Sequence, residues 1–245
     1  MNSAASRTSR ALCRLSRGAR PAALALALAL GGALALAGCA GHNLSRTVGK
    51  GNGEFHSSIG GPFFDSLGPA IPVPHMNLGG RYGVTDWMDV DGSVNATALA
   101  YSLLAFDIAT NFQLYRKPRA LAVASSIRLY NIGDLDDAPG YRAYPELGLH
   151  LGGPVTSWLH LYGGVTSTFQ FSPPETKTPV FLTPFFGTEF LMPPRGGTNR
   201  QHGLALHLGW TNPWQSSESV VAYQPGYGGL ALYLNYRVRF GGLDR

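Results

Sequence analysis

Apolar and polar residues alternate one by one along most of the chain after residue 53. The clearest example is the segment 229–240, where Leu, Tyr, Val and Phe side chains share one face and small, polar or Arg side chains share the other. Alternation with a period of two predicts a β-strand that is apolar on one face only. A length of about eleven residues is also what a tilted strand needs to cross a bilayer.

The same alternation recurs along the chain and predicts ten strands. They lie near residues 54–61, 76–84, 89–98, 105–115, 120–130, 143–152, 158–171, 180–192, 201–210 and 229–240. Gly, Pro and other turn-forming residues separate them, and long helical patterns are missing. We therefore expect an all-β domain over residues 54–245, folded as an antiparallel up-and-down transmembrane β-barrel of about ten strands (8–10).

The connections between these strands alternate in length. Short turns are predicted at 85–88, 116–119, 153–157 and 193–200, and longer loops at 62–75, 131–142 and 211–228. Short turns at one end and longer loops at the other are typical of outer-membrane barrels, where the short turns are periplasmic. The connection at 172–179 is intermediate in length, and the one near Tyr101 is shorter than this rule requires. The N-terminus is then periplasmic, and the long outer loops can contact a ligand or partner.

Residues 1–38 have a different composition. A stretch without acidic residues carries five arginines and precedes an apolar run, Pro21 to Ala35, which ends in Leu36-Ala37-Gly38-Cys39; the arginines are Arg7, Arg10, Arg14, Arg17 and Arg20. This order of basic, apolar and small residues predicts a secretory signal. The alternatives are an ordinary signal with a chance Cys, or a transmembrane anchor, for which about 20 apolar residues are needed.

The sequence Leu-Ala-Gly-Cys resembles the lipobox of bacterial lipoproteins. The resemblance implies that residues 1–38 are a lipoprotein signal peptide, cleaved before Cys39, and that Cys39 is lipidated, a modification that includes palmitate. Residues 39–53 are small, polar and rich in Gly, so we expect them to be a flexible tether between the lipid and the barrel.

Removal of the signal changes the charge and the cysteine content. Five of the 19 basic residues precede Cys39 and none of the 14 acidic ones does, so the cleaved chain has 14 of each sign. A neutral chain does not indicate a nucleic-acid partner. Cys13 leaves with the signal, so Cys39 has no partner for a disulfide. We expect no cofactor and no nucleic acid.

The polar faces of the predicted strands are mostly small, with a few charges and imidazoles at mid-strand. This mixture favours the lumen of a narrow barrel with lipid outside. The alternative is a soluble, lipid-anchored β-barrel of the lipocalin kind, whose apolar faces point inward to hold a small apolar ligand. The residues that we predict to form a lumen-facing polar network are Arg81, Asp107, Arg128, Glu146, His150, His160, Glu189, His207, Arg237 and Arg239.

Residues 77–93 are similar to a hairpin common in outer-membrane β-barrel proteins: a strand ending in Arg-Tyr-Gly-Val, the turn Thr-Asp-x-x-Asp, and a second strand. We expect Asp86 and Asp89 to accept hydrogen bonds from backbone amides of this turn. The strand 229–240 ends in Phe240, which resembles the C-terminal assembly signal of such barrels. The resemblance implies outer-membrane lipid and the barrel-assembly machinery as partners.

Few residues fit a catalytic or metal-binding pattern. Asp134, Asp136 and Asp137 have the chemistry to bind a divalent cation, but they also fit a solvated turn. Loop residues Ser216, Ser217, Glu218 and Ser219 resemble parts of a lipid-modifying hydrolase or acyltransferase site, but no His is near them in sequence. We therefore predict no catalytic, metal or cofactor site. Ten strands enclose little space beyond side chains, so a wide pore is not expected either.

The sequence therefore predicts a non-enzymatic lipoprotein of the cell outer membrane. Its expected role is structural, or the binding of a ligand or envelope partner through the loops at 62–75, 131–142 and 211–228.

Overall fold

The computed structural model describes residues 42–64, 71–72, 75–135, 140–171, 178–193, 199–216 and 227–241. All of these residues belong to one compact unit of the chain, Ala37–Arg245. Cys39 and the predicted signal peptide, residues 1–38, lie outside the described residues. Within the described part, no helix is long and apolar enough to cross a membrane.

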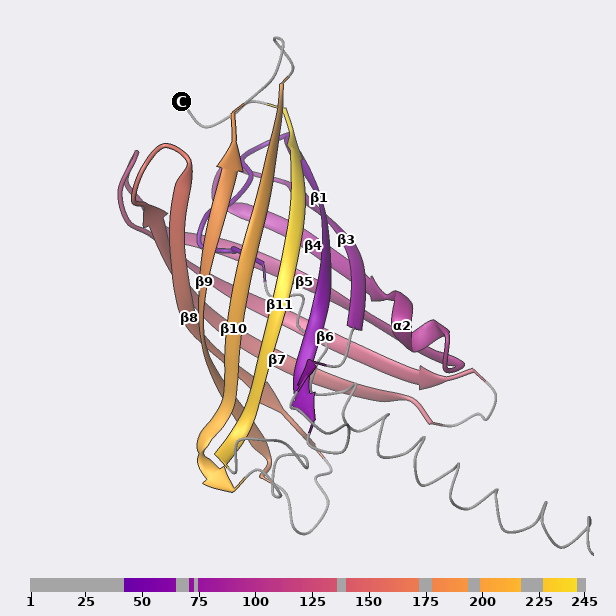
Figure 1. Ribbon diagram of the computed structural model, residues 1–245. Helices are drawn as coiled ribbons and strands as arrows, with labels where there is room; N and C mark the ends of the chain where they lie inside the picture. The colour runs from indigo at the N-terminus through magenta and orange to yellow at the C-terminus, as the bar shows by residue number, and fades with distance from the viewer. Residues whose placement is uncertain are drawn as a thin grey trace, which may run out of the picture. The chain divides into compact units, whose positions relative to one another are not determined.

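Ten strands form a closed antiparallel β-barrel, as the alternation predicted (Figure 1). Each strand pairs with its neighbours in the order of the sequence, and the last pairs with the first. The barrel strands are β1 (Gly53–Phe64), β3 (His75–Gly83), β4 (Met88–Asn95), β5 (Leu103–Arg116), β6 (Ala122–Asp134), β7 (Arg142–Pro154), β8 (Leu159–Phe169), β9 (Val180–Met192), β10 (Arg200–Ser216) and β11 (Tyr227–Phe240).

Two short elements lie between the barrel strands. The two-residue strand β2 (Ile71–Pro72) pairs with the end of β1 at Phe63 and Phe64. The helix α2 (Ala96–Leu99) follows β4, whereas the sequence predicted that this strand continues to residue 98. The side chain of Asn95 accepts a hydrogen bond from the Ala98 amide at 2.9 Å, which caps the helix and ends the strand.

The barrel closes along ten paired positions of β1 and β11. The register runs from Gly53 opposite Phe240 to Pro62 opposite Ala231. Figure 1 shows β11 in yellow beside β1 in indigo, so the two ends of the strand order meet. Closure gives each of the ten described barrel strands a partner on both sides, so these strands satisfy their backbone hydrogen bonds internally.

The two faces of the barrel wall differ in chemistry. Outward-facing Ile108 and Leu206 are 56% and 45% exposed, whereas the neighbouring Asp107 and His207 are 3% and 7% exposed. The same alternation holds in β1, where Phe55 and Ile59 face outward and Glu54, His56 and Ser58 are buried. A lipocalin-like barrel requires an apolar interior, so this arrangement is the reverse of that alternative.

Gly60 offers a test of the junction that closes the barrel. Its φ is +142°, and a Cβ atom at this position would lie 2.1 Å from the carbonyl oxygen of Leu232 in β11. We expect Gly60→Ala to lower the free energy of unfolding by about 2 kcal/mol or more, because both the backbone conformation and the strand separation must change. Urea titration followed by tryptophan fluorescence measures the loss.

Gly80→Ala in β3 is the matched control. A Cβ atom there would lie 3.5 Å from the Glu54 carbonyl oxygen, which is an ordinary contact. Equal losses for the two variants would show that the β1–β11 junction has no special sensitivity.

Candidate functional site

The N-terminal residues 42–49 lie inside the barrel, and we call them the plug segment. Its side chains are buried, apart from the half-buried Arg46. The buried side chains with their exposed fractions are His42 5%, Asn43 7%, Leu44 5%, Ser45 2%, Thr47 1% and Val48 0%. The segment therefore fills part of the lumen from the N-terminal side of β1.

Side chains of the barrel wall hold the plug segment on opposite sides. Asn43 Nδ2 donates a hydrogen bond to Glu189 Oε2 in β9 at 2.9 Å. In β5, Gln113 Nε2 donates to the carbonyl of Ser45 at 3.0 Å, and Gln113 Oε1 accepts from the amide of Thr47 at 3.0 Å. The backbone polar groups of the plug thus find partners within the barrel.

The plug ends at the short turns of the barrel. Asp89 accepts a hydrogen bond from the Val48 amide at 3.0 Å, and Asp86 accepts one from the Lys50 amide at 3.1 Å. Arg46 Nη2 donates to the carbonyl of Ala120 at 2.6 Å in the turn after β5. The two aspartates bond backbone amides, as we predicted, but the amides belong to the plug segment and the residue after it.

The plug segment departs from the sequence expectation for residues 39–53. We predicted a flexible tether there, yet residues 42–49 are held by hydrogen bonds from three barrel strands. Small polar residues suit a crowded polar lumen as well as they suit water, so composition alone does not separate the two environments.

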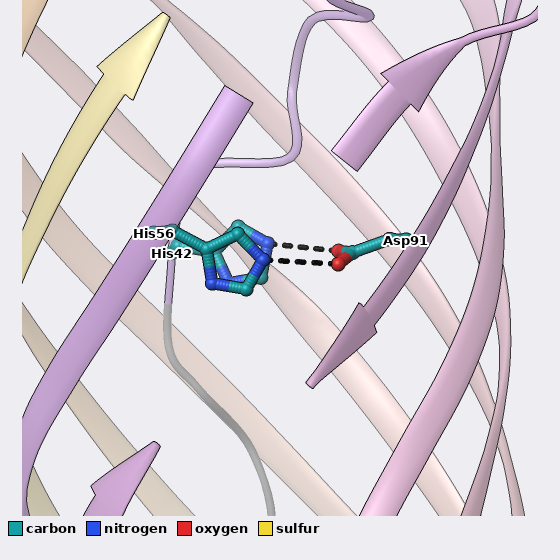
Figure 2. Close-up of side chains that lie close together, drawn as sticks. All are labelled: His42, His56 and Asp91. Carbon is teal, nitrogen blue, oxygen red and sulfur yellow. Dashed lines mark hydrogen bonds and ion pairs between the residues drawn. The ribbon is translucent and has the colours of Figure 1, made fainter. Parts of the chain in front are cut away.

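Three side chains converge on one point where the plug meets the wall. His42 comes from the plug, His56 from β1 and Asp91 from β4 (Figure 2). The Nε2 atoms of His42 and His56 lie 2.9 Å and 3.0 Å from the two carboxylate oxygens of Asp91. The imidazole rings stack with their centroids 4.1 Å apart and their planes 22° apart. All three side chains are buried, and their donor atoms lie within 4.8 Å of one another.

The environment of His42 favours a neutral imidazole. Burial lowers its pKa from the usual value to about 4, and the neighbouring His56 lowers it as well, while Asp91 acts in the opposite direction. A neutral imidazole has one nitrogen lone pair available to accept a proton or to bind a metal ion.

Asp91 also belongs to a buried ion-pair network. Arg128 Nη2 lies 3.1 Å from Asp91 Oδ2, and Arg128 Nη1 pairs with Asp107. The hydroxyl of Ser93 donates a hydrogen bond to the other oxygen of Asp107. The guanidinium of Arg128 is therefore shared between two carboxylates.

A second network surrounds Glu54 on β1. Its carboxylate lies 3.1 Å from Arg81, 2.9 Å from Arg237 and 3.4 Å from Arg239. Arg237 also pairs with Glu189, the carboxylate that accepts the hydrogen bond from Asn43 of the plug. The plug is thus tied into the ion pairs of the wall.

The structure places nine of the ten predicted network residues in buried positions, and leaves His160 half-buried near the short turns. His150 Nε2 is 2.9 Å from the Ser126 hydroxyl, Glu146 accepts hydrogen bonds from Tyr130 and Thr168, and His207 stacks on Phe185. The predicted residues thus spread over several clusters along the lumen.

Sequence reasoning missed the residues that form the tightest cluster. His42 was assigned to the tether, and His56 and Asp91 were not singled out. A signal for the last two was present, because Glu54, His56 and Ser58 alternate with Phe55 and Ile59, and Asp91 alternates with Val90. No sequence signal indicates that His42 contacts them.

Of the other candidates, Asp134 ends β6 and Ser216 ends β10, while Asp136, Asp137 and residues 217–219 lie outside the described residues.

A pocket of about 590 Å³ opens beside the plug at the short turns. It is lined mainly by cationic and polar groups, which give it the chemistry to accept an anion. Its cationic and imidazole lining residues are Arg46, Arg116, Arg119, His160, Arg237 and Arg239.

Glu54→Gln is expected to lower the free energy of unfolding by about 3–5 kcal/mol, because it removes the buried negative charge that faces three arginines. Urea titration of the folded barrel measures this. Glu146→Gln is the control, since the Glu146 carboxylate accepts hydrogen bonds from two hydroxyl groups and lies across the strand pair from one arginine, Arg128, so a smaller loss of about 1–2 kcal/mol is expected. If Glu54→Gln lowers the free energy of unfolding no more than Glu146→Gln does, the ion pairs of Glu54 do not make the expected contribution to stability.

No family model matches the sequence, and no curated protein matches it. Among solved structures, the translocator domain of autotransporter NalP from Neisseria meningitidis is 9% identical, with a TM-score of 0.39 over 79% of this chain and 89% of that one. A Pseudomonas aeruginosa FadL homologue is 10% identical, with a TM-score of 0.35 over 77% of this chain; the match spans 61% of that homologue. A bacterial polysaccharide outer membrane secretin is 9% identical, with a TM-score of 0.36 over 80% of this chain and all of that one. Values this low carry no information about ligand or activity.

Proposed function

We propose that this protein is a non-enzymatic lipoprotein of the bacterial outer membrane, built as a β-barrel whose lumen is closed by its own plug segment. Its role is structural, or the binding of a ligand or envelope partner through the loops at 62–75, 131–142 and 211–228. The observation that carries the proposal is the apolar outer face of a closed sheet around a charged, filled lumen.

The distribution of polarity supports a bilayer as the solvent. Large apolar side chains are exposed on the outer face of every barrel strand, and examples are Ile59, Leu78, Val90, Ile108, Ile127, Leu149, Leu206 and Leu234. Soluble monomers seldom expose contiguous apolar surface on this scale. Transmembrane barrels carry such a band on the outside and polar residues inside.

The two ends of the barrel support an orientation. The plug segment contacts the short turns at residues 84–87 and 117–121, and the longer connections lie at the other end of the strands. By the rule for outer-membrane barrels, the end with the short turns faces the periplasm. The N-terminus then enters from the periplasm, and β11 with Phe240 is the strand offered to the barrel-assembly machinery.

The contents of the lumen support a role other than catalysis or the free passage of solutes. Ion pairs and the plug segment occupy it, and a barrel of this strand number encloses little space. Ser126 and His150 are hydrogen-bonded, but His150 Nδ1 has no hydrogen-bond partner among the described residues. The acid that orients the histidine in a Ser–His–acid triad is therefore lacking there.

The membrane assignment is tested on residues 40–245. Without detergent the protein is expected to aggregate, and after refolding in detergent it should migrate faster on a gel unheated than boiled. In lipid vesicles, Ile108→Arg should cost about 2–4 kcal/mol of folding free energy, because the charge falls near the middle of the lipid-facing band.

Leu114→Arg, near the end of the same strand, is the matched control and should cost about 0–1 kcal/mol. A soluble monomer without detergent, or equal costs at the two positions, would refute a membrane-spanning barrel and leave a soluble one.

The lipid anchor is tested separately at Cys39. Labelled palmitate is expected to enter the wild-type protein and to be absent from Cys39→Ser. The variant should still fold and, like the wild type, migrate faster on a gel unheated than boiled, because the barrel wall itself contacts the bilayer. Equal labelling of both proteins would exclude lipidation at this residue.

A further inference from the structure

We propose that His42, His56 and Asp91 form a binding site for a divalent transition-metal ion of the Zn²⁺ class, and that the bound ion clamps the plug segment to the barrel wall. This goes beyond the envelope role proposed above and does not depend on the lipid anchor or on the outer loops.

The donor atoms already converge. Both Nε2 atoms lie against the same carboxylate, at 2.9 Å and 3.0 Å, and the stacked rings aim in the same direction (Figure 2). An ion bound among the three groups would replace these two contacts by bonds of about 2.0–2.2 Å. Three protein ligands with a further position for water are a known arrangement for zinc.

The ligand types select the class of metal. Two imidazoles and one carboxylate suit Zn²⁺, Cu²⁺ and Ni²⁺, whereas Ca²⁺ and Mg²⁺ prefer sets made of oxygen ligands. Arg128 lies beside Asp91, but it also pairs with Asp107. The two carboxylates and one guanidinium group therefore carry one net negative charge.

The charge balance of the lumen gives an independent reason for a cation. Among the described residues, the buried acidic side chains are Glu54, Asp89, Asp91, Asp107, Glu146 and Glu189, and the buried arginines are Arg81, Arg128, Arg237 and Arg239. Arg46 of the plug segment is half-buried in the same lumen. Six carboxylates against five guanidinium groups leave one negative charge, and a cation at the cluster would compensate it in an interior where uncompensated charge is costly.

The position of the ligands gives the metal a structural effect. His42 is 49 residues from Asp91 in sequence, and His56 is 35 residues from it. The ion would therefore join the plug to β1 and to β4 at once. Metal binding that requires the seated plug must stabilise that seated state.

The test uses the full-length protein, purified in detergent from membranes without a polyhistidine tag and stripped with EDTA. Titration with Zn²⁺ is expected to give one ion per chain, with Mg²⁺ not competing, and Co²⁺ should give the absorption bands of a tetrahedral site. His42→Ala and His56→Ala should each weaken Zn²⁺ binding by at least about 100-fold, since even outer-shell partners of a metal are worth 10- to 100-fold.

Hydrogen exchange tests the clamp. At a Zn²⁺ concentration of 100 times the Kd, amide exchange in residues 43–48 should slow by about 100-fold in the wild type and not in His56→Ala. Asp91→Asn also breaks the ion pair with Arg128 and so risks unfolding, which is why the two histidine variants carry the test.

His75→Ala is the matched control, because His75 is buried in the same chain at 2% exposure but lies outside the cluster. It should bind Zn²⁺ as the wild type does. Zn²⁺ binding that survives either His42→Ala or His56→Ala, or that is equally lost in His75→Ala, would overturn the site. Exchange in the plug that does not respond to Zn²⁺ would overturn the clamp.

Discussion

The pairing of β1 with β11 is the interaction on which the rest of the structure depends. It turns an open sheet into a barrel, and so it gives every barrel strand two partners. Once the sheet is closed, its two faces become an outside and an inside with different solvents. The apolar face and the charged face of each strand are then separated by the wall, which is the condition for a lumen that holds ion pairs.

The charged side chains that line the inside of a barrel need partners of opposite charge, and the space between them must be filled. Guanidinium groups balance part of the carboxylate charge: Arg128 bridges Asp91 and Asp107, and Glu54 faces three arginines. The plug segment does another part, because its amides and side chains satisfy Asp89, Gln113 and Glu189. The chain itself thus fills part of a polar interior.

The plug also relates the N-terminus to function. It contacts the end of the barrel that carries the short turns. The loops that we propose to bind a ligand or partner are at the other end. The His42–His56–Asp91 cluster lies where the plug meets the wall, so the proposed ion would act on the contact between the plug segment and the barrel.

The amino-acid sequence by itself predicted about ten strands (8–10), their approximate bounds and which face of each is apolar, because these follow from local alternation and turn residues. It also indicated that charges such as Asp107 and Arg128 share the lumen face, since both lie on the polar side of their strands. It did not show that Asn95 caps a helix, nor that residues 42–49 turn into the barrel, because small polar residues are equally suited to water. Only the tertiary structure decided the closing register and the meeting of His42 with His56 and Asp91, since these contacts join distant parts of the chain and depend on the space that closure leaves inside.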